Sequence, residues 1–232
     1  MIFNKETVID GLIIPVFKPL NWTSFDIVKK LRNDFKKVFN LKKIKVGHAG
    51  TLDPLATGLL LICTGKKTKI IKDLQNLDKT YLATFHFGKT TPSFDMETDF
   101  NKNFPNDHIT DDLVIKNLSY FKGKIKQKPP IYSALKFNGK RMYEIARKGE
   151  TIDIDHRDVF IHEFEMLNNN FPEFDFKIKC SKGTYIRSLA HDFGKKLNSG
   201  AFLKYLERYS IGEYNINNCL TIESIRKLLS NQ

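Results

Sequence analysis

The chain has 232 residues, of which 38 are Lys or Arg and 26 are Asp or Glu, so its formal net charge is +12. The length suffices for one substantial core, and the hydrophobic fraction of 41% is that of an ordinary globular protein. The excess of positive charge therefore favours a polyanionic partner.

A secretory signal and a membrane span are both excluded, because the apolar runs are too short. Lys5, Glu6 and Asp10 interrupt the first residues, and no later apolar run approaches the roughly 18 residues of a span. We therefore predict a cytoplasmic protein that does not contact a membrane.

The three cysteines are odd in number and far apart. Cys63, Cys180 and Cys219 also lack C-x-x-C spacing. In a cytosolic protein this pattern predicts reduced thiols and neither disulfides nor a zinc site.

The first predicted element is an amphipathic helix from Thr23 to Phe39, in which apolar residues recur at helical spacing. Thr23 and Asp26 have the spacing of a capping box. GLLLICTG, residues 58–65, is a continuous apolar run and predicts either a buried strand or a short helix. YLATFHFG, residues 81–88, alternates as a strand does.

Beyond a polar loop from Asp95 to Asp107, Thr110 is predicted to cap a second helix. The later predicted elements are strands at 159–167 and 174–180, a helix from near Tyr185 to before Gly200, and a helix from Thr221 to Leu229. Strands and helices do not alternate strictly, so we predict an α+β fold with a mixed, mostly antiparallel sheet and flanking helices.

A basic stretch runs from Lys122 to Lys148, where nine basic residues stand against one acid, Glu144. Tyr132, Phe137 and Tyr143 are interleaved with them. A plain solvated surface is the alternative, but the aromatic residues and a Pro-Pro pair favour an RNA-contacting segment.

Several kinds of chemistry have no support in the sequence. Gly58 and the GKKT at 65–68 are separated by six residues, whereas a phosphate loop needs four. H-E-x-x-H and G-x-S-x-G are both absent. Asp95, Glu97 and Asp99 could serve a metal-dependent nuclease, but we interpret them as solvated loop acids, so no metal site is predicted.

GHAGTLDPLATG, residues 47–58, places a single acid in a loop with three glycines and a proline. Glycines allow close approach of a ligand, and Pro54 keeps Asp53 out of helical geometry, which suits a nucleophile or a base. Equally, Asp53 could cap a helix that begins at Pro54. The loop alone leaves these two interpretations open.

The same loop resembles the catalytic loop of the TruB family of tRNA pseudouridine synthases, because it matches G-H-x-G-x-L-D-P-x-A-x-G at every fixed position. Further similar segments follow in family order over roughly residues 13–215: KPLNWTSFDIV, DKTYLATFHFG, KPPIYSALKFNGKRMYEIARKG, GTYIRSLAHDFG and FLKYLERYSIGEY. Asn21 stands in KPLNWTS where the family commonly has glycine, and asparagine tolerates the left-handed backbone of such a turn.

The resemblance implies isomerisation of the T-loop uridine at tRNA position 55, with Asp53 as the catalytic aspartate acting on a flipped-out base. The implied roles of the other residues are stacking on the base for Tyr81, orientation of the aspartate for Arg187, lining of the uracil pocket for Tyr185 and Leu206, and entry into the T-loop for His48. The reaction needs no redox change and no group donor, so no cofactor is expected.

The resemblance also implies how RNA is held. The basic stretch, taken as about 122–152, would match an insertion that grips the T-stem-loop, and its predicted RNA-binding residues are Lys128, Lys136, Lys140, Arg141 and Arg147. Lys18 is predicted either to contact RNA or to support the catalytic loop. A non-catalytic RNA-binding protein or tRNA folding chaperone is the alternative function.

We predict a single catalytic domain over residues 1–232, which ends in a short helical tail at about 217–232. Longer family members continue into an RNA-binding PUA domain, whereas this sequence ends shortly after GEY. The expected partner is therefore the T-arm of tRNA alone, bound by a monomer without a protein partner.

Overall fold

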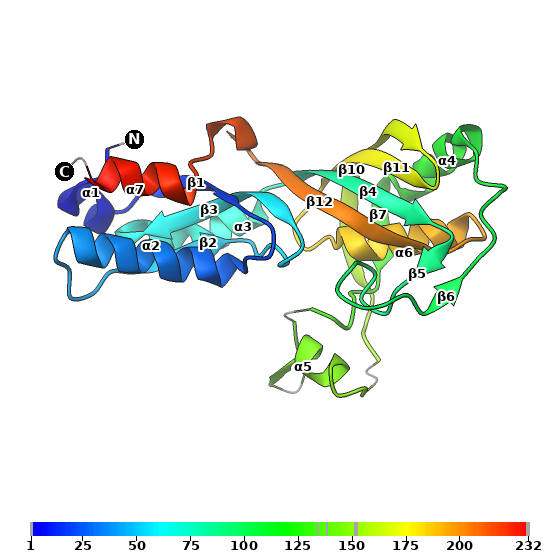
Figure 1. The fold of residues 1–232 in the computed structure, drawn as a ribbon, viewed down its shortest axis with the longest axis horizontal. Helices are drawn as coiled ribbons and strands as arrows, with labels where there is room; N and C mark the ends of the chain where they lie inside the picture. The colour runs from blue at the N-terminus through cyan, green and yellow to red at the C-terminus, as the bar shows by residue number, and fades with distance from the viewer. Residues whose placement is uncertain (1, 134, 138, 151–152, 231–232) are drawn as a thin grey trace. The chain divides into compact units, whose positions relative to one another are not determined.

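The computed structural model describes residues 2–133, 135–137, 139–150 and 153–230 (Figure 1). Four residues of the predicted basic insertion and the last two of the predicted tail therefore lie outside the described residues. The chain forms two compact units, one of residues 1–81 and 206–232 and the other of residues 82–205. Two strands, β4 (Lys79–Phe87) and β12 (Ala201–Ile211), contribute residues to both units.

The first unit is built on a sheet in which β3 (Thr57–Thr64) lies between β1 and β12. β3 pairs antiparallel with β1 and β2, and parallel with β12 through Glu207↔Thr57 and Arg208↔Gly58. Its other elements are α1 (Lys5–Asp10), β1 (Ile13–Lys18), α2 (Ser24–Val38), β2 (Val46–Ala49), a 3-10 helix (Gly65–Ile70), α3 (Ile71–Asn76), β13 (Tyr214–Asn215), a 3-10 turn (Ile216–Asn218) and α7 (Ile222–Ser230).

Helix α2 forms as its sequence predicts, with a capping box in which Thr23 and Asp26 bond each other's backbone N–H. Its apolar face, which includes Leu31 and Phe35, is buried in a core shared with α1, β1, β3 and α7. The turn before α2 contains Asn21 at φ 65°, the left-handed conformation expected there.

Gly58 fixes the spacing between β3 and β12. Its φ is 104°, and a Cβ added there would lie 2.5 Å from the Arg208 carbonyl oxygen and 2.8 Å from the Arg208 nitrogen. Contacts this short with backbone cannot be relieved by moving a side chain. The two strands can therefore approach as they do because residue 58 has no side chain.

The second unit contains the strand order β4–β11–β10–β7, with β11 antiparallel to β10 and β10 antiparallel to β7. Phe85, Phe164, Phe176 and Phe193 form its aromatic core, with ring centroids 4.7–6.5 Å apart. Its elements besides β4 and β12 are β5 (Lys89–Thr90), β6 (Lys102–Asn103), α4 (Asp111–Leu118), a 3-10 turn (Ser119–Phe121), β7 (Gly123–Gln127), β8 (Lys136–Phe137), β9 (Lys140–Arg141), α5 (Met142–Ala146), β10 (Arg157–Asn170), β11 (Glu173–Cys180) and α6 (Ile186–Lys196).

The predicted α+β class with a mixed, mostly antiparallel sheet is confirmed, since β3 and β12 form the parallel pair among antiparallel neighbours. The apolar run at 58–65 is a strand rather than a short helix. All three cysteines are free thiols, as predicted. No described helix is long and apolar enough to cross a membrane.

Candidate active site

Asp53 lies in the loop between β2 and β3, in the first unit. The residues after Pro54 form a turn, closed by the Ala56 N–H donating to the Asp53 carbonyl at 3.1 Å, and β3 begins at Thr57. No helix begins at Pro54, so the interpretation of Asp53 as a helix cap is wrong. The carboxylate stands on a short turn between two strands, where backbone contacts can hold it.

Lys18 bonds the backbone of this loop with its ammonium group. Its side chain is fully buried, and its ammonium donates to the carbonyls of Pro19 at 2.9 Å, Trp22 at 2.6 Å and Pro54 at 3.3 Å. An ammonium without solvent exposure cannot reach an RNA phosphate. The RNA contact predicted for Lys18 is therefore corrected to its alternative, support of the catalytic loop.

The buried position of Lys18 changes the pKa of its ammonium. Burial lowers the pKa of Lys18 to about 8, because desolvation disfavours the ammonium, while the nearby carboxylate of Asp53 acts in the opposite direction. Arg208 adds a like charge that lowers the pKa further. Asp53 is thus placed within the electrostatic field of two buried cations.

Arg208 is the second buried support of the loop. Its guanidinium donates to the carbonyls of Leu59 at 2.8 Å, Gly50 at 3.0 Å and Thr51 at 3.4 Å. The guanidinium fork suits this task, because its donors are fixed in one plane. Arg208 is not among the predicted site residues. In β12 it is buried, as is Leu206 two positions earlier, so the two side chains lie on the same face of the strand.

Ser24, the first residue of α2, is the third support. Its hydroxyl accepts from the Leu52 N–H at 2.8 Å and donates to the Leu52 carbonyl at 3.1 Å. Lys18, Ser24 and Arg208 together bond the backbone at Gly50, Thr51, Leu52 and Pro54. The residues on both sides of Asp53 are held by buried side chains, which limits the positions available to its carboxylate.

Three other predicted site residues belong to the same unit as Asp53. His48 lies in β2, and burial, followed by the charge of Arg208, lowers its pKa, so the imidazole is neutral at pH 7. Tyr81 in β4 and Leu206 in β12 are both buried. Their buried aromatic and aliphatic surfaces are suited to the wall of an apolar pocket.

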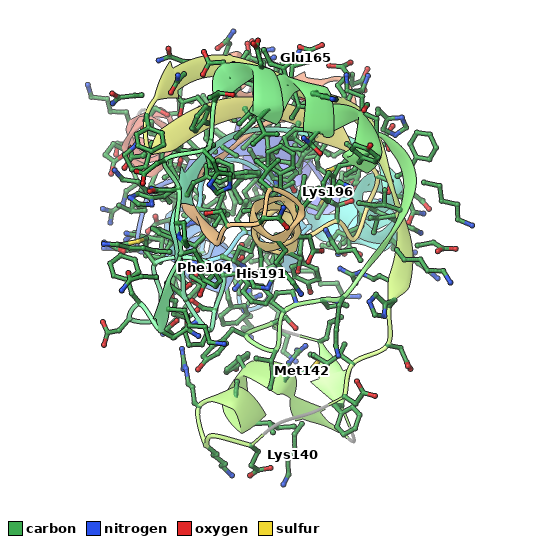
Figure 2. The ribbon with its side chains drawn as sticks, turned by 90° about the vertical axis from the view of Figure 1, so that its right-hand side faces the viewer. Phe104, Lys140, Met142, Glu165, His191 and Lys196 are labelled. Atoms are coloured by element: carbon green, nitrogen blue, oxygen red, sulfur yellow. The ribbon has the colours of Figure 1, made fainter. Side chains whose placement is uncertain are left out.

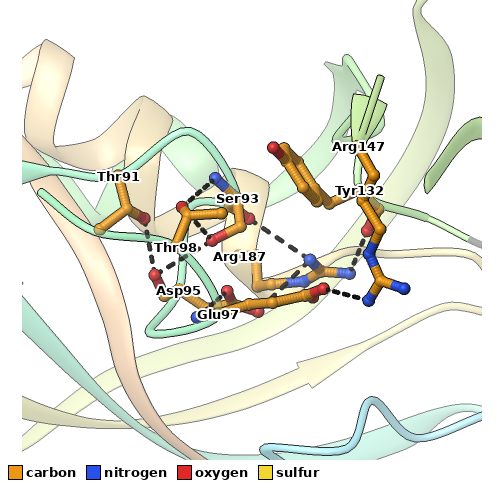
Figure 3. A network of polar contacts seen from close by, with 8 residues as sticks. All are labelled: Thr91, Ser93, Asp95, Glu97, Thr98, Tyr132, Arg147 and Arg187. Carbon is orange, nitrogen blue, oxygen red and sulfur yellow. Dashed lines mark hydrogen bonds and ion pairs between the residues drawn. The ribbon is translucent and has the colours of Figure 1, made fainter. Parts of the chain in front are cut away.

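Arg187 lies in the first turn of α6, in the second unit, and is almost fully buried. It pairs with the carboxylate of Asp95, with 3.3 Å between Nη1 and Oδ2, and donates to the carbonyls of Ser93 at 3.3 Å and Tyr132 at 3.0 Å (Figure 3). Tyr185 lies nearby, with its ring centroid 6.0 Å from the Arg187 Cζ. Tyr185 and Arg187 therefore lie close together at the start of α6, and their roles toward a uracil base stay predictions.

The interpretation of Asp95 as a solvated loop acid is wrong. Its side chain is 7% exposed and forms the buried ion pair with Arg187. The surrounding turn is ordered by short polar contacts, in which Thr91 and Ser93 donate to the Asp95 carbonyl and the Glu97 N–H donates to Oδ1 (Figure 3). The pairing was not visible in the sequence, because the two residues are 92 positions apart.

The predicted RNA-binding residues of the basic segment are largely exposed. Lys136 pairs with Arg141 and Phe137 with Lys140 across β8 and β9, and Figure 2 shows Lys140 at the outer end of this segment. Lys128 and Arg147 are already engaged by carboxylates, those of Asp153 at 3.0 Å and Glu97 at 2.9 Å. The exposed strands β8 and β9 thus carry three of the five predicted RNA-binding residues.

Among the described residues, no group of three or more His, Cys, Asp or Glu side chains is arranged to hold a metal ion. Asp95, which we weighed as a nuclease ligand, is engaged by Arg187.

Comparisons with known proteins identify the family of this chain. Residues 36–186 match the family described as TruB family pseudouridylate synthase, N-terminal domain. Proteins named tRNA pseudouridine synthase B from Flavobacterium johnsoniae and Phocaeicola vulgatus are 53% and 48% identical to this chain, and the alignments cover 94% and 96% of it and 95% of each relative.

Among solved structures, a Cbf5–Nop10–Gar1 complex contains a chain of similar fold, with a TM-score of 0.70 and 27% identity. The match covers 95% of this chain and 54% of that chain, so this chain spans about half its length. With the family model matching well over half of the residues and relatives about 50% identical over most of the chain, this protein belongs to the TruB family of pseudouridine synthases.

Proposed function

We propose that this pseudouridine synthase isomerises the uridine at position 55 in the T-loop of tRNA, and that Asp53 is its catalytic aspartate. Relatives about 50% identical are named as tRNA pseudouridine synthases, and the net charge of +12 suits a polyanionic substrate. The observation that carries the assignment of Asp53 is the support of its loop by the buried side chains of Lys18, Ser24 and Arg208.

The reaction rearranges one nucleotide without adding or removing a group. The bond between C1′ of the ribose and N1 of uracil breaks, the base rotates, and a bond forms between C1′ and C5; C5 then loses its proton to water and N1 takes up a proton, so the composition of the nucleotide is unchanged. Asp53 acts on the nucleotide while the glycosidic bond breaks. Such chemistry needs a carboxylate that is ionised and fixed in place, and no cofactor.

The base must leave the T-loop stack before Asp53 can reach it. Unstacking costs a few kcal/mol, which stacking on an aromatic side chain offsets. We assign this stacking to Tyr81, and the remaining pocket walls to Tyr185 and Leu206. His48, whose lowered pKa keeps it neutral, inserts into the T-loop without adding a charge.

Arg187 orients the carboxylate of Asp53 and favours its charged form, because a guanidinium beside a carboxylate stabilises the anion. The basic segment with Lys136, Lys140 and Arg141 binds the T-stem phosphates. The enzyme acts as a monomer on the T-arm.

Tritium release from C5 of uridine in an unmodified tRNA transcript tests the proposal. We expect release by the wild type at a single site, position 55, and none above background by Asp53→Asn, which keeps the shape of the side chain. Both proteins should bind the transcript with similar affinity, because the substitution removes no RNA-phosphate contact. Release by Asp53→Asn at the wild-type rate would contradict the catalytic role, and tight binding without release by the wild type would favour a tRNA chaperone.

A further inference from the structure

Gln127, the last residue of β7, clamps the backbone of Tyr185. Its side-chain carbonyl accepts from the Tyr185 N–H at 2.8 Å, and its side-chain amide donates to the Tyr185 carbonyl at 3.0 Å. Gln127 is 1% exposed, so these two bonds are formed away from water. A single carboxamide thus satisfies both backbone groups of one residue, as a neighbouring strand would.

Arg157, the first residue of β10, acts on the same segment. It pairs with Gln127 across the β7–β10 ladder, and directly opposed side chains lie on the same face of a sheet. Its guanidinium donates to the Gly183 carbonyl and lies over the Tyr185 ring, with 4.4 Å from Cζ to the ring centroid. Gln127 therefore holds the backbone of Tyr185, and Arg157 holds its ring.

The start of helix α6 depends on these contacts. Tyr185 is the N-cap residue of α6, yet no side chain of the helix caps this end. Ser188 adds a further tie, because its hydroxyl donates to the Lys128 carbonyl at 2.8 Å. The first turn of α6, which also contains Arg187, is thus fastened to residues 127 and 128 at the end of β7.

We infer that Gln127 and Arg157 are positioning residues of the isomerisation, which set the ring of Tyr185 and, through the first turn of α6, the guanidinium of Arg187. The inference rests on the proposed function, in which Tyr185 lines the uracil pocket and Arg187 orients Asp53. In this inference both residues act through Tyr185 and the first turn of α6, and Gln127 is too buried to contact RNA. Their contribution is therefore to the geometry of the reacting complex and not to the affinity for RNA.

Gln127→Met tests the clamp, because methionine has a similar length but neither donates nor accepts these bonds. A misplacement of about 1 Å can cost about a hundredfold in rate, so we expect kcat on a T-stem-loop to fall about 10- to 100-fold. KM and the dissociation constant of the RNA should stay within about threefold. An unchanged kcat, or a loss confined to KM, would overturn the inference.

Ser199→Ala is the matched control for stability. Its buried hydroxyl donates to the Pro105 carbonyl at 2.9 Å in the same unit, outside the proposed site. Both variants are assayed well below their unfolding temperatures. If Ser199→Ala lowers kcat as much as Gln127→Met at a similar loss of thermal stability, general destabilisation explains the result and the inference fails.

Gln127→Glu gives a signature in the pH profile. An ionised carboxylate can accept from the Tyr185 N–H but cannot donate to the Tyr185 carbonyl, whereas a protonated carboxyl can do both. Burial raises the pKa of the introduced carboxyl, so its protonation falls within an accessible pH range. The kcat of Gln127→Glu relative to wild type should rise as the pH is lowered, while the ratio for Gln127→Met stays flat. A flat ratio for both variants would contradict the clamp.

Fluorine NMR separates failure of the inference from failure of the proposed function. In protein labelled with 3-fluorotyrosine, the signal of Tyr185 is assigned by its loss in Tyr185→Phe. Arg157→Gln and Gln127→Met should each shift this signal in the free protein, and Ser199→Ala should not. An unmoved signal overturns the positioning role even if the enzyme is active, and a shifted signal supports it even if position 55 is not the target.

Discussion

The loop around Asp53 and the basic segment both depend on positively charged side chains, but these side chains are buried in the first and exposed in the second. At Gly50 to Pro54, the cations are buried and directed at backbone carbonyls, so their charge holds the loop in place. In β8 and β9, Lys136, Lys140 and Arg141 are exposed at the surface. Under the proposed function, the first arrangement would fix the geometry of the reacting carboxylate, and the second would supply affinity for RNA without fixed geometry.

This difference predicts that the two regions fail differently when their charges are removed. Removing a cation of the loop leaves buried and half-buried carbonyls without these donors, which costs folding free energy and should disturb Asp53. Removing an exposed cation of β8 or β9 should cost little folding free energy and mainly weaken RNA binding. Changes in the loop should therefore lower stability and turnover, and changes in the basic segment should lower the affinity for RNA.

The largest effect is expected for Arg208→Met. Three carbonyls lose their donor, so the free energy of unfolding should fall by about 3–5 kcal/mol, measured by urea denaturation. Lys66→Met is the control, because its ammonium pairs with Asp10 at the surface, where both side chains are largely exposed, and its loss should leave the free energy of unfolding nearly unchanged. Similar losses in the two variants would show that the buried contacts of Arg208 contribute little.

The effect of pH on Lys18 is expected to be next in size. The pKa of Lys18 is about 8 in the folded protein and 10.5 at its ordinary value, so between these values the unfolded chain binds more protons and the free energy of unfolding rises with pH. The cost of the buried charge is fully present below pH 8 and disappears by pH 10.5. Over this range the unfolding free energy of the wild type should rise by up to about 3 kcal/mol relative to that of Lys18→Met. A constant difference would mean that Lys18 is not desolvated.

The smallest effect on stability is expected in the basic segment. Replacement of Lys136, Lys140 and Arg141 by glutamine should change the free energy of unfolding by less than about 0.5 kcal/mol. RNA binding should weaken, and the slope of log K against log salt should fall by about 3, one for each lost phosphate contact. Turnover at saturating RNA should be unchanged. A loss of turnover would show that the segment also positions the substrate.

Local features of the fold could be predicted from the sequence because their causes lie within a few residues. The capping box of Thr23 and Asp26, the cap at Thr110 and the strand at 81–88 all depend on short-range patterns, and the structure confirms them. The loop around Asp53 was found for the same reason, since glycine and proline mark it within twelve residues.

The supports of the site could not be predicted, because they act between distant positions. Arg208 bonds Gly50 across 158 positions, and Arg187 pairs with Asp95 across 92. A charged residue in the sequence gives no sign of whether it is buried, so Asp95 was interpreted as solvated and Lys18 as a possible RNA ligand. Gln127 carries no charge and gave no signal at all.

The contact at Gly58 has a consequence for anyone who would transplant this loop into another scaffold. The segment from Gly50 to Gly58 is not portable by itself, because its shape depends on a neighbouring strand that passes within 2.5 Å of the place where a Cβ would stand at residue 58. A graft would have to carry Arg208 and its strand along with the loop. In a library of variants, no residue other than glycine should be tolerated at position 58, because even the Cβ of alanine would clash with the backbone of Arg208.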